Sequence, residues 1–161
     1  MKVQPVTTEC LGEIKHEPGV YALIMSLKEK RTITIGQLGT FDFDPGWYVY
    51  LGSAHGPGGV KRRTDRHRRD DDHKRKRWNV DYFRPFATMH EIWFSYAPTC
   101  REHDWAWSVM RMCGAKIPVR KFGADDCYPR CDAHFFHFPS RPFPAEFRGD
   151  LMRLSRYTQP L

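Results

Sequence analysis

The sequence predicts an α+β fold in which helices flank a mostly antiparallel central sheet. Strand patterns gather within residues 19–52, where short turns join them, instead of alternating regularly with helices. An amphipathic helix and a short late strand then follow in the second half of the chain. The 161 residues and their 40% hydrophobic content suit a single domain over 1–161. We expect its core over about 18–138 and a C-terminal helical tail over about 139–161.

Four strand patterns occupy the first third of the chain. The run GVYALIMSL at 19–27 is continuously apolar, which is typical of a central strand. RTITIG at 31–36 and TFDF at 40–43 alternate apolar and polar residues, and the short QLG between them predicts a hairpin. WYVYLG at 47–52 gives the fourth strand. The hairpin is therefore inserted between two tyrosine-bearing strands.

Helical patterns follow the fourth strand. A glycine-rich loop leads into VKRRTDRHRR at 60–69, which can be helical. A second helix over 101–113 places Trp105, Val109 and Met112 on one apolar stripe, and Gly114 is a typical helix stop. The remaining expected elements are a helix at about 78–87 that Pro85 would end or kink, strands at 89–97 and 134–138, and a terminal helix at 144–157.

Most of the net charge of +7 lies in one segment. Residues 61–77 hold 10 Lys or Arg against 4 Asp, and such a concentrated positive field attracts a polyanion. A solvated face or a loop is the alternative interpretation. The side chains expected to contact a nucleic acid are Lys61, Arg62, Arg66, Arg68, Arg69, Lys74, Arg75, Lys76 and Arg77.

Other partners and compartments are disfavoured. No apolar run of about 18 residues exists, so no membrane span is expected. The N-terminus lacks a signal-peptide pattern, and the five cysteines are an odd number, so we expect a cytoplasmic protein with free thiols. Association with the nucleoid is expected from the nucleic-acid partner. The glycine-rich loop matches neither of the common phosphate-binding motifs, so no nucleotide cofactor is expected.

Two tyrosines are candidates for chemistry. Side chains alternate faces along a strand, so Tyr21 and Tyr50 can converge on one sheet face if their strands are neighbours. A tyrosine hydroxyl can take part in proton transfer when a cation lies nearby. The alternative is that both are core aromatic residues with hydrogen-bonded hydroxyls.

Three further side chains could complete a site. Arg63 and His67 lie four residues apart and share one helix face, where a guanidinium suits phosphate oxygens and an imidazole can exchange protons. The alternative is a basic helix that only grips phosphates. Glu102 lies beside an apolar helical stripe and could hold a divalent cation, or it could simply favour the helix N-terminus.

The late segment CYPRCDAHFFH offers Cys127, Cys131 and His134 as ligands for a structural zinc, with Cys113 as a further ligand. The cysteine spacing is wider than the C-x-x-C of zinc ribbons, which makes zinc the less favoured interpretation. The alternative is a loop packed over the sheet, with His134 near the cleft.

Several of these motifs, taken in order, resemble the GIY-YIG nuclease superfamily. The longer strings WYVYLGSAHGPGGV, WNVDYF and DDCYPRCDAHFFHF are similar to a small branch catalogued as a domain of unknown function, sometimes fused to endonuclease III-type repair enzymes. The motifs are GVY at 19–21, YLG at 50–52, V-x-x-R-x-x-x-H at 60–67 and E-x-x-W-A at 102–106.

This resemblance implies a DNA endonuclease that uses Mg²⁺ or Mn²⁺ in repair or in processing DNA structures. Tyr21 and Tyr50 would orient or deprotonate water, Arg63 would stabilise phosphate charge, His67 would assist proton transfer, and Glu102 would bind the metal. A catalytically weak nucleic-acid-binding module that uses residues 61–77 is the alternative. The chain departs from the pattern in Val20 and Leu51, in the wide separation of the two tyrosines, which are 29 positions apart, and in Asn79, where a histidine is expected in the branch.

Overall fold

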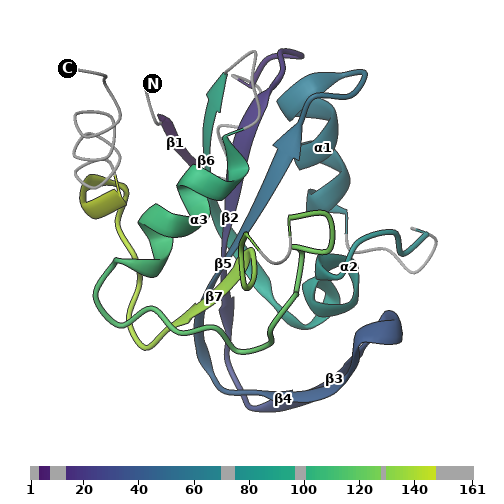
Figure 1. Cartoon of the computed structure of the whole chain (residues 1–161), viewed down its shortest axis with the longest axis vertical. Helices are drawn as coiled ribbons and strands as arrows, with labels where there is room; N and C mark the ends of the chain where they lie inside the picture. The colour runs from purple at the N-terminus through teal and green to yellow at the C-terminus, as the bar shows by residue number, and fades with distance from the viewer. Residues whose placement is uncertain (1–3, 8–13, 70–74, 97–100, 128–129, 148–161) are drawn as a thin grey trace.

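A five-stranded antiparallel sheet forms the centre of the molecule (Figure 1). The computed structural model describes residues 4–7, 14–69, 75–96, 101–127 and 130–147. In these residues the strand order is β1-β6-β2-β5-β7, and helices flank the sheet, which confirms the α+β prediction. The strands are β1 (Gln4–Thr7), β2 (Gly19–Leu27), β5 (Gly46–Ala54), β6 (Thr88–Tyr96) and β7 (Phe135–Phe138).

Strand β2 lies in the middle of the sheet, paired with β5 on one side and β6 on the other. All of its residues except the partly exposed Ser26 are buried. Tyr21 and Leu23 belong to one hydrophobic cluster, whereas Val20 and Ala22 belong to a second. The continuous apolar run is therefore explained by a strand that faces two cores.

The predicted inserted hairpin is present as a separate two-stranded ribbon, which bends away from the main sheet (Figure 1). Strands β3 (Arg31–Ile35) and β4 (Gly39–Phe43) pair in antiparallel register, and the 3₁₀ turn η2 (Gly36–Leu38) joins them. Gly36 has φ +48° in this turn, a conformation that favours glycine.

Helices cover the two clusters separately. Helix α1 (Gly59–Arg68) and helix α2 (Val80–Phe83) supply Val60, Val80 and Phe83 to the cluster that contains Tyr21. Helix α3 (Glu102–Met110) supplies Trp105, Ala106 and Val109 to the opposite cluster, which also contains Met112, as the apolar stripe predicts. Each face of the sheet thus has its own helical cover.

Two elements differ from the sequence prediction. The expected helix at 78–87 is only the turn α2 followed by the 3₁₀ turn η3 (Arg84–Phe86), because Pro85 has no N–H to continue the helix. Strand β1 was not predicted. Residues 144–147 are helical, and the rest of the expected terminal helix lies outside the described residues. Within the described part, no helix is both long and apolar enough to span a membrane.

Candidate active site

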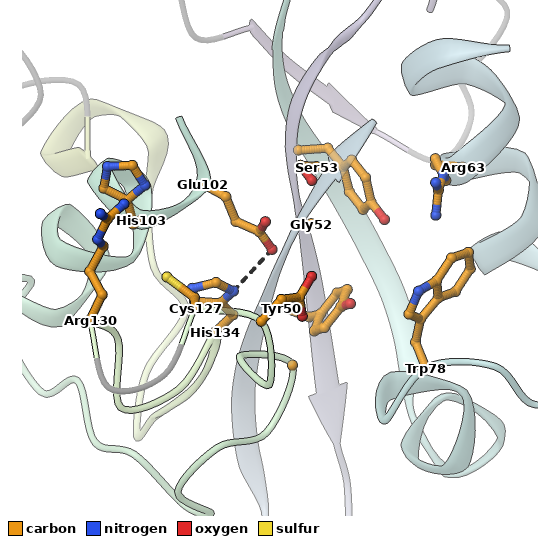
Figure 2. A pocket seen from close by; sticks show the side chains of 13 residues that line it. Tyr50, Gly52, Ser53, Arg63, Trp78, Glu102, His103, Cys127, Arg130 and His134 are labelled. Carbon is orange, nitrogen blue, oxygen red and sulfur yellow. Dashed lines mark hydrogen bonds and ion pairs between the residues drawn. The ribbon is translucent and has the colours of Figure 1, made fainter. Parts of the chain in front are cut away.

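A pocket of about 540 Å³ opens at the C-terminal end of β5 (Figure 2). Four of the five candidate catalytic side chains line it: Tyr21, Tyr50, Arg63 and Glu102. Strand β7 pairs with β5 only as far as Tyr50, so the last residues of β5 lie at a sheet edge. Side chains from α1 and α3, which cover opposite faces of the sheet, can therefore meet around this edge.

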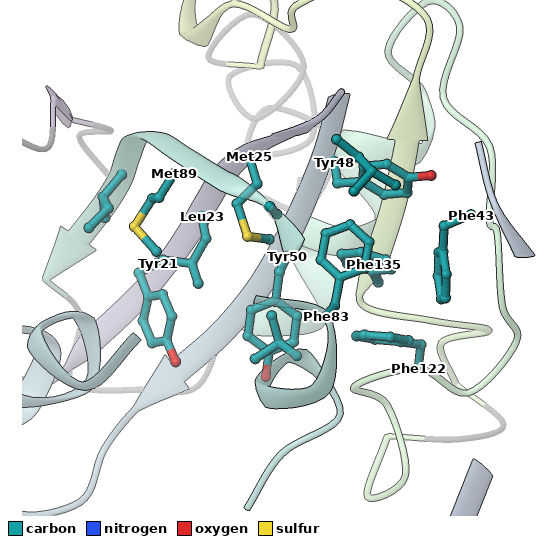
Figure 3. Close-up of a cluster of buried hydrophobic side chains, with 14 of the residues drawn as sticks. Tyr21, Leu23, Met25, Phe43, Tyr48, Tyr50, Phe83, Met89, Phe122 and Phe135 are labelled. Atoms are coloured by element: carbon teal, nitrogen blue, oxygen red, sulfur yellow. The ribbon is translucent and has the colours of Figure 1, made fainter. Parts of the chain in front are cut away.

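Tyr21 and Tyr50 lie on the same face of the sheet with their hydroxyl groups pointing the same way (Figure 3). Both are almost fully buried. Burial raises the pKa of Tyr21 well above its ordinary value, although the nearby Arg63 partly opposes the shift. Burial also raises the pKa of Tyr50, and a charge on Tyr21 would raise it further. Both hydroxyls therefore keep their protons at neutral pH.

The fifth candidate, His67, lies behind Tyr21 and does not line the pocket. Its Nε2 is 2.8 Å from the Tyr21 hydroxyl, and the ring is fully buried. Gly52 makes room for this pair, because a Cβ at that position would overlap the Tyr21 ring. The Tyr21 phenol is thus placed between the pocket and an imidazole.

Asp81 lies next to His67, on the side of the imidazole away from Tyr21. Its carboxylate accepts two hydrogen bonds of 2.8 Å from Arg66, and two more from the backbone N–H groups of Arg77 and Trp78. Burial alone would raise the pKa of Asp81, but these hydrogen bonds outweigh it and hold the pKa below its ordinary value. The ionised carboxylate lies 4.0 Å from His67 Nδ1.

Trp78 forms a wall of the pocket next to Arg63. Three guanidinium groups stack over its ring, with centroid distances of 4.7 Å for Arg63, 4.3 Å for Arg66 and 5.2 Å for Arg77. Such stacking fixes the direction of a long, flexible side chain. Trp78 therefore holds Arg63 at the pocket and gathers two more arginines behind it.

A second concavity of about 760 Å³ shares Arg63 and Trp78 with the pocket. Five arginines line this basic groove, together with His16 and Asp65: Arg62, Arg63, Arg66, Arg69 and Arg77. The groove and the pocket are therefore neighbours, with Arg63 and Trp78 in contact with both.

The other side chains expected to contact a nucleic acid do not line the groove. Lys61 forms an ion pair of 3.0 Å with Asp65, and Lys76 lies over the ring of Tyr82. Arg68 and Arg75 are exposed, and Lys74 is outside the described residues.

Glu102 reaches the pocket from the first turn of α3. Its Oε1 accepts a hydrogen bond of 2.9 Å from Nδ1 of His134, a residue that is only 2% exposed. Among the described residues Oε2 has no hydrogen-bond partner. Asp104, two residues along, instead forms an ion pair of 2.9 Å with Arg101 outside the pocket. Glu102 is therefore the helix carboxylate that faces the pocket.

Cys127, Cys131 and His134 lie together beside Glu102, with one potential ligand atom of each within 4.8 Å of the others. The two sulfurs are 3.2 Å apart. Burial raises the pKa of the Cys131 thiol to about 12. Cys113 is exposed and does not belong to this cluster.

Trp78, Asp81 and the Glu102–His134 bond were not identified from the sequence. The first two fall in the string WNVDYF, and an aspartate next to aromatic residues within a short helix was the available signal. In the same string, Asn79 accepts a hydrogen bond of 2.8 Å from the N–H of Gly123 and so ties α2 to the loop at the pocket rim.

Comparison with known proteins places the chain in one family. Residues 20–156 match the family model described as domain of unknown function DUF123, and the chain therefore belongs to that family. No curated protein and no solved structure matches the chain.

Proposed function

We propose that this protein is a metal-dependent DNA endonuclease of the GIY-YIG type, which hydrolyses phosphodiester bonds in DNA repair or DNA structure processing. The observation that carries this proposal is the meeting of Tyr21, Tyr50, Arg63 and Glu102 in one pocket that shares Arg63 with the basic groove. A buried aromatic core would not need a guanidinium and a carboxylate at its edge. A guanidinium together with a carboxylate that holds a cation would stabilise the charge that develops on a phosphate during hydrolysis.

The donor set suits a hard divalent cation. Mg²⁺ is commonly held by one or two carboxylates, several waters and the substrate phosphate. Glu102 presents Oε2 without a partner in the described residues, and Asp126 lines the same pocket. Glu102 would hold the cation, with Asp126 nearby, and the bound cation would supply charge stabilisation for the phosphate oxygens. Arg63 binds the phosphate from the opposite side of the pocket.

Tyr21 and His67 provide a path for the proton of the attacking water. Because burial raises its pKa, the Tyr21 phenol is protonated and donates to Nε2 of His67. As the water oxygen forms its bond to phosphorus, its proton moves to the Tyr21 oxygen and the phenol proton moves to His67. The bond to the leaving oxygen breaks, and that oxygen takes a proton from solvent. Asp81 stabilises the imidazolium that results.

Tyr50 acts as a hydrogen-bond donor in this scheme. Its hydroxyl is protonated because burial raises its pKa, and it lines the pocket beside Tyr21. A neutral donor in this position orients either the water or a non-bridging phosphate oxygen.

A cleavage panel tests the proposal. Supercoiled plasmid, flaps, four-way junctions, single strands and damaged duplexes are incubated with the purified protein, with Mg²⁺, with Mn²⁺ and with a chelator. We expect cleavage of at least one substrate with either metal and none with the chelator. Failure to cleave any substrate with either metal would contradict the proposal.

The second candidate function is a nucleic-acid-binding module without significant catalysis. The basic groove favours it, because five arginines can bind phosphates without any help from the pocket. Salt-sensitive binding to the same panel without cleavage is the result that would support this candidate over the nuclease.

A further inference from the structure

We propose that Cys127, Cys131 and His134 form a binding site for a zinc ion, separate from the Mg²⁺ position at Glu102. Two thiols and an imidazole are the donors that zinc prefers, whereas Mg²⁺ prefers oxygen ligands. One ligand atom of each residue lies within 4.8 Å of the other two. The site does not depend on the nuclease proposal, since its test is metal binding and not cleavage.

The hydrogen bonding of His134 is the first argument for a metal. Nδ1 donates to Glu102, so in a neutral ring the proton is on Nδ1 and Nε2 carries a lone pair. Nε2 is buried and has no hydrogen-bond partner among the described residues, in a side chain that is only 2% exposed. Figure 2 shows the Cys127 sulfur beside the His134 ring, on the side away from Glu102. A buried lone pair without a donor is costly unless a ligand satisfies it.

The Glu102–His134 pair is the second argument. Histidines that bind zinc commonly donate their other ring N–H to a carboxylate, which fixes the tautomer and the ring orientation. Glu102 already occupies that position at 2.9 Å. A zinc ion on Nε2 would in turn hold the imidazole in place and so orient the Glu102 carboxylate at the pocket.

Backbone hydrogen bonds explain why the wide cysteine spacing is compatible with a metal. The N–H of Cys131 donates to the carbonyl of Cys127 at 3.3 Å, which holds the two cysteines next to each other. The N–H of Cys127 is held by the carbonyl of Ala124 at 3.0 Å. His134 is fixed by hydrogen bonds of 2.9 Å to Phe122 and Leu51.

The separation of the two sulfurs needs only a small adjustment. With Zn–S bonds of about 2.3 Å in a tetrahedral site, two ligand sulfurs lie about 3.7 Å apart. The observed separation of the sulfurs is 3.2 Å. Three protein ligands would leave one coordination position for water, and two of the ligand residues, Cys127 and His134, line the pocket.

Metal content of purified protein tests this site. The chain is purified under reducing conditions, stripped with a chelator, and titrated with Zn²⁺ and with Co²⁺, whose thiolate charge-transfer absorption reports cysteine ligands. We expect about one metal per chain. Cys127→Ser and His134→Asn should each weaken binding roughly a hundredfold or more. Cys113→Ser removes an exposed thiol outside the cluster and should bind as the parent does.

Alkylation of the unaltered chain keeps the proposal testable if the variants fail to fold. Cysteines are labelled with and without Zn²⁺ and mapped by mass spectrometry. We expect Zn²⁺ to protect Cys127 and Cys131 but not Cys113. The proposal is overturned if the reduced parent takes up no metal, if Zn²⁺ leaves the labelling rate of Cys127 and Cys131 unchanged from the metal-free chain, or if Co²⁺ binds without thiolate absorption.

Discussion

The hydroxyl of Tyr21 lies 2.8 Å from Nε2 of His67, although the two residues are 46 positions apart in the chain. The contact joins the central strand to helix α1 in a fully buried position. Burial keeps the Tyr21 hydroxyl protonated, and in the proposed mechanism the imidazole of His67 accepts that proton. The proposed proton path depends on this pair.

His67→Gln should therefore change the pH dependence of cleavage as well as its rate. With no imidazole to accept the Tyr21 proton, the reaction depends on hydroxide or on ionised Tyr21, whose pKa burial raises well above 10.0. We expect the rate of the variant to fall by roughly 10²–10⁴ near neutral pH. Its rate should rise with pH more steeply than that of the parent, because hydroxide and ionised Tyr21 become more abundant. Parallel pH profiles for both proteins would contradict the path.

Gly52→Ala should displace Tyr21 from His67. A Cβ at Gly52 would overlap the Tyr21 ring, and overpacking of this kind costs about 1–3 kcal/mol of unfolding free energy. Gly56→Ala is the matched control, because its Cβ would meet only the end of Arg63 at 3.4 Å. Thermal unfolding and cleavage assays should show losses for the first variant only. Equal behaviour of the two variants would mean that the close contact at Gly52 has no consequence.

Asp81→Asn should destabilise the protein by about 2–3 kcal/mol near neutral pH, because it leaves Arg66 without its buried carboxylate. The folded-state pKa of Asp81 lies below the unfolded value of 3.8, so its stabilisation is present above that pH. It is lost as pH falls through the folded pKa. Denaturant unfolding should thus show a difference from the parent that shrinks below about pH 4. A difference that is constant with pH would rule out this ionic contribution.

The basic groove should set the salt dependence of DNA binding. Replacing Arg62 and Arg69 together by alanine removes two groove guanidiniums, and the slope of log K against log salt should become shallower by about 2. Arg111→Ala, at the C-terminal end of α3 and outside the groove, should leave the slope unchanged. Fluorescence anisotropy of labelled DNA over a salt series measures the slope for each variant. An unchanged slope in the groove variant would place the DNA elsewhere.

The strand order could not be read from the sequence, but most strands and helices could, because their signals are local. The continuous apolar run of β2 and the alternation in β3 and β4 follow directly from burial on two faces or on one. Strand β1 has the short sequence QPVT and shows no such pattern. It is defined by its pairing with β6, a contact between distant parts of the chain.

Part of the candidate site could also be predicted from the sequence, because its motifs are local. The order of motifs indicated Tyr21, Tyr50, Arg63 and Glu102, but it could not show that they share a pocket. Asp81 binds a residue 15 positions away, and His134 bonds Glu102 across 32 positions, so neither role has a local signal. Such partners become visible only when the fold brings the segments together.

The central claim is that Glu102 holds the cation for phosphodiester cleavage, and one paired measurement tests it most directly. Glu102→Gln and Asp104→Asn each neutralise one carboxylate in the first turn of α3, but only Glu102 lines the pocket. The rate of Mg²⁺-dependent cleavage of the best substrate should fall at least about 10³-fold for Glu102→Gln. It should stay within about twofold of the parent for Asp104→Asn. Equal cleavage by Glu102→Gln and the parent would contradict the account.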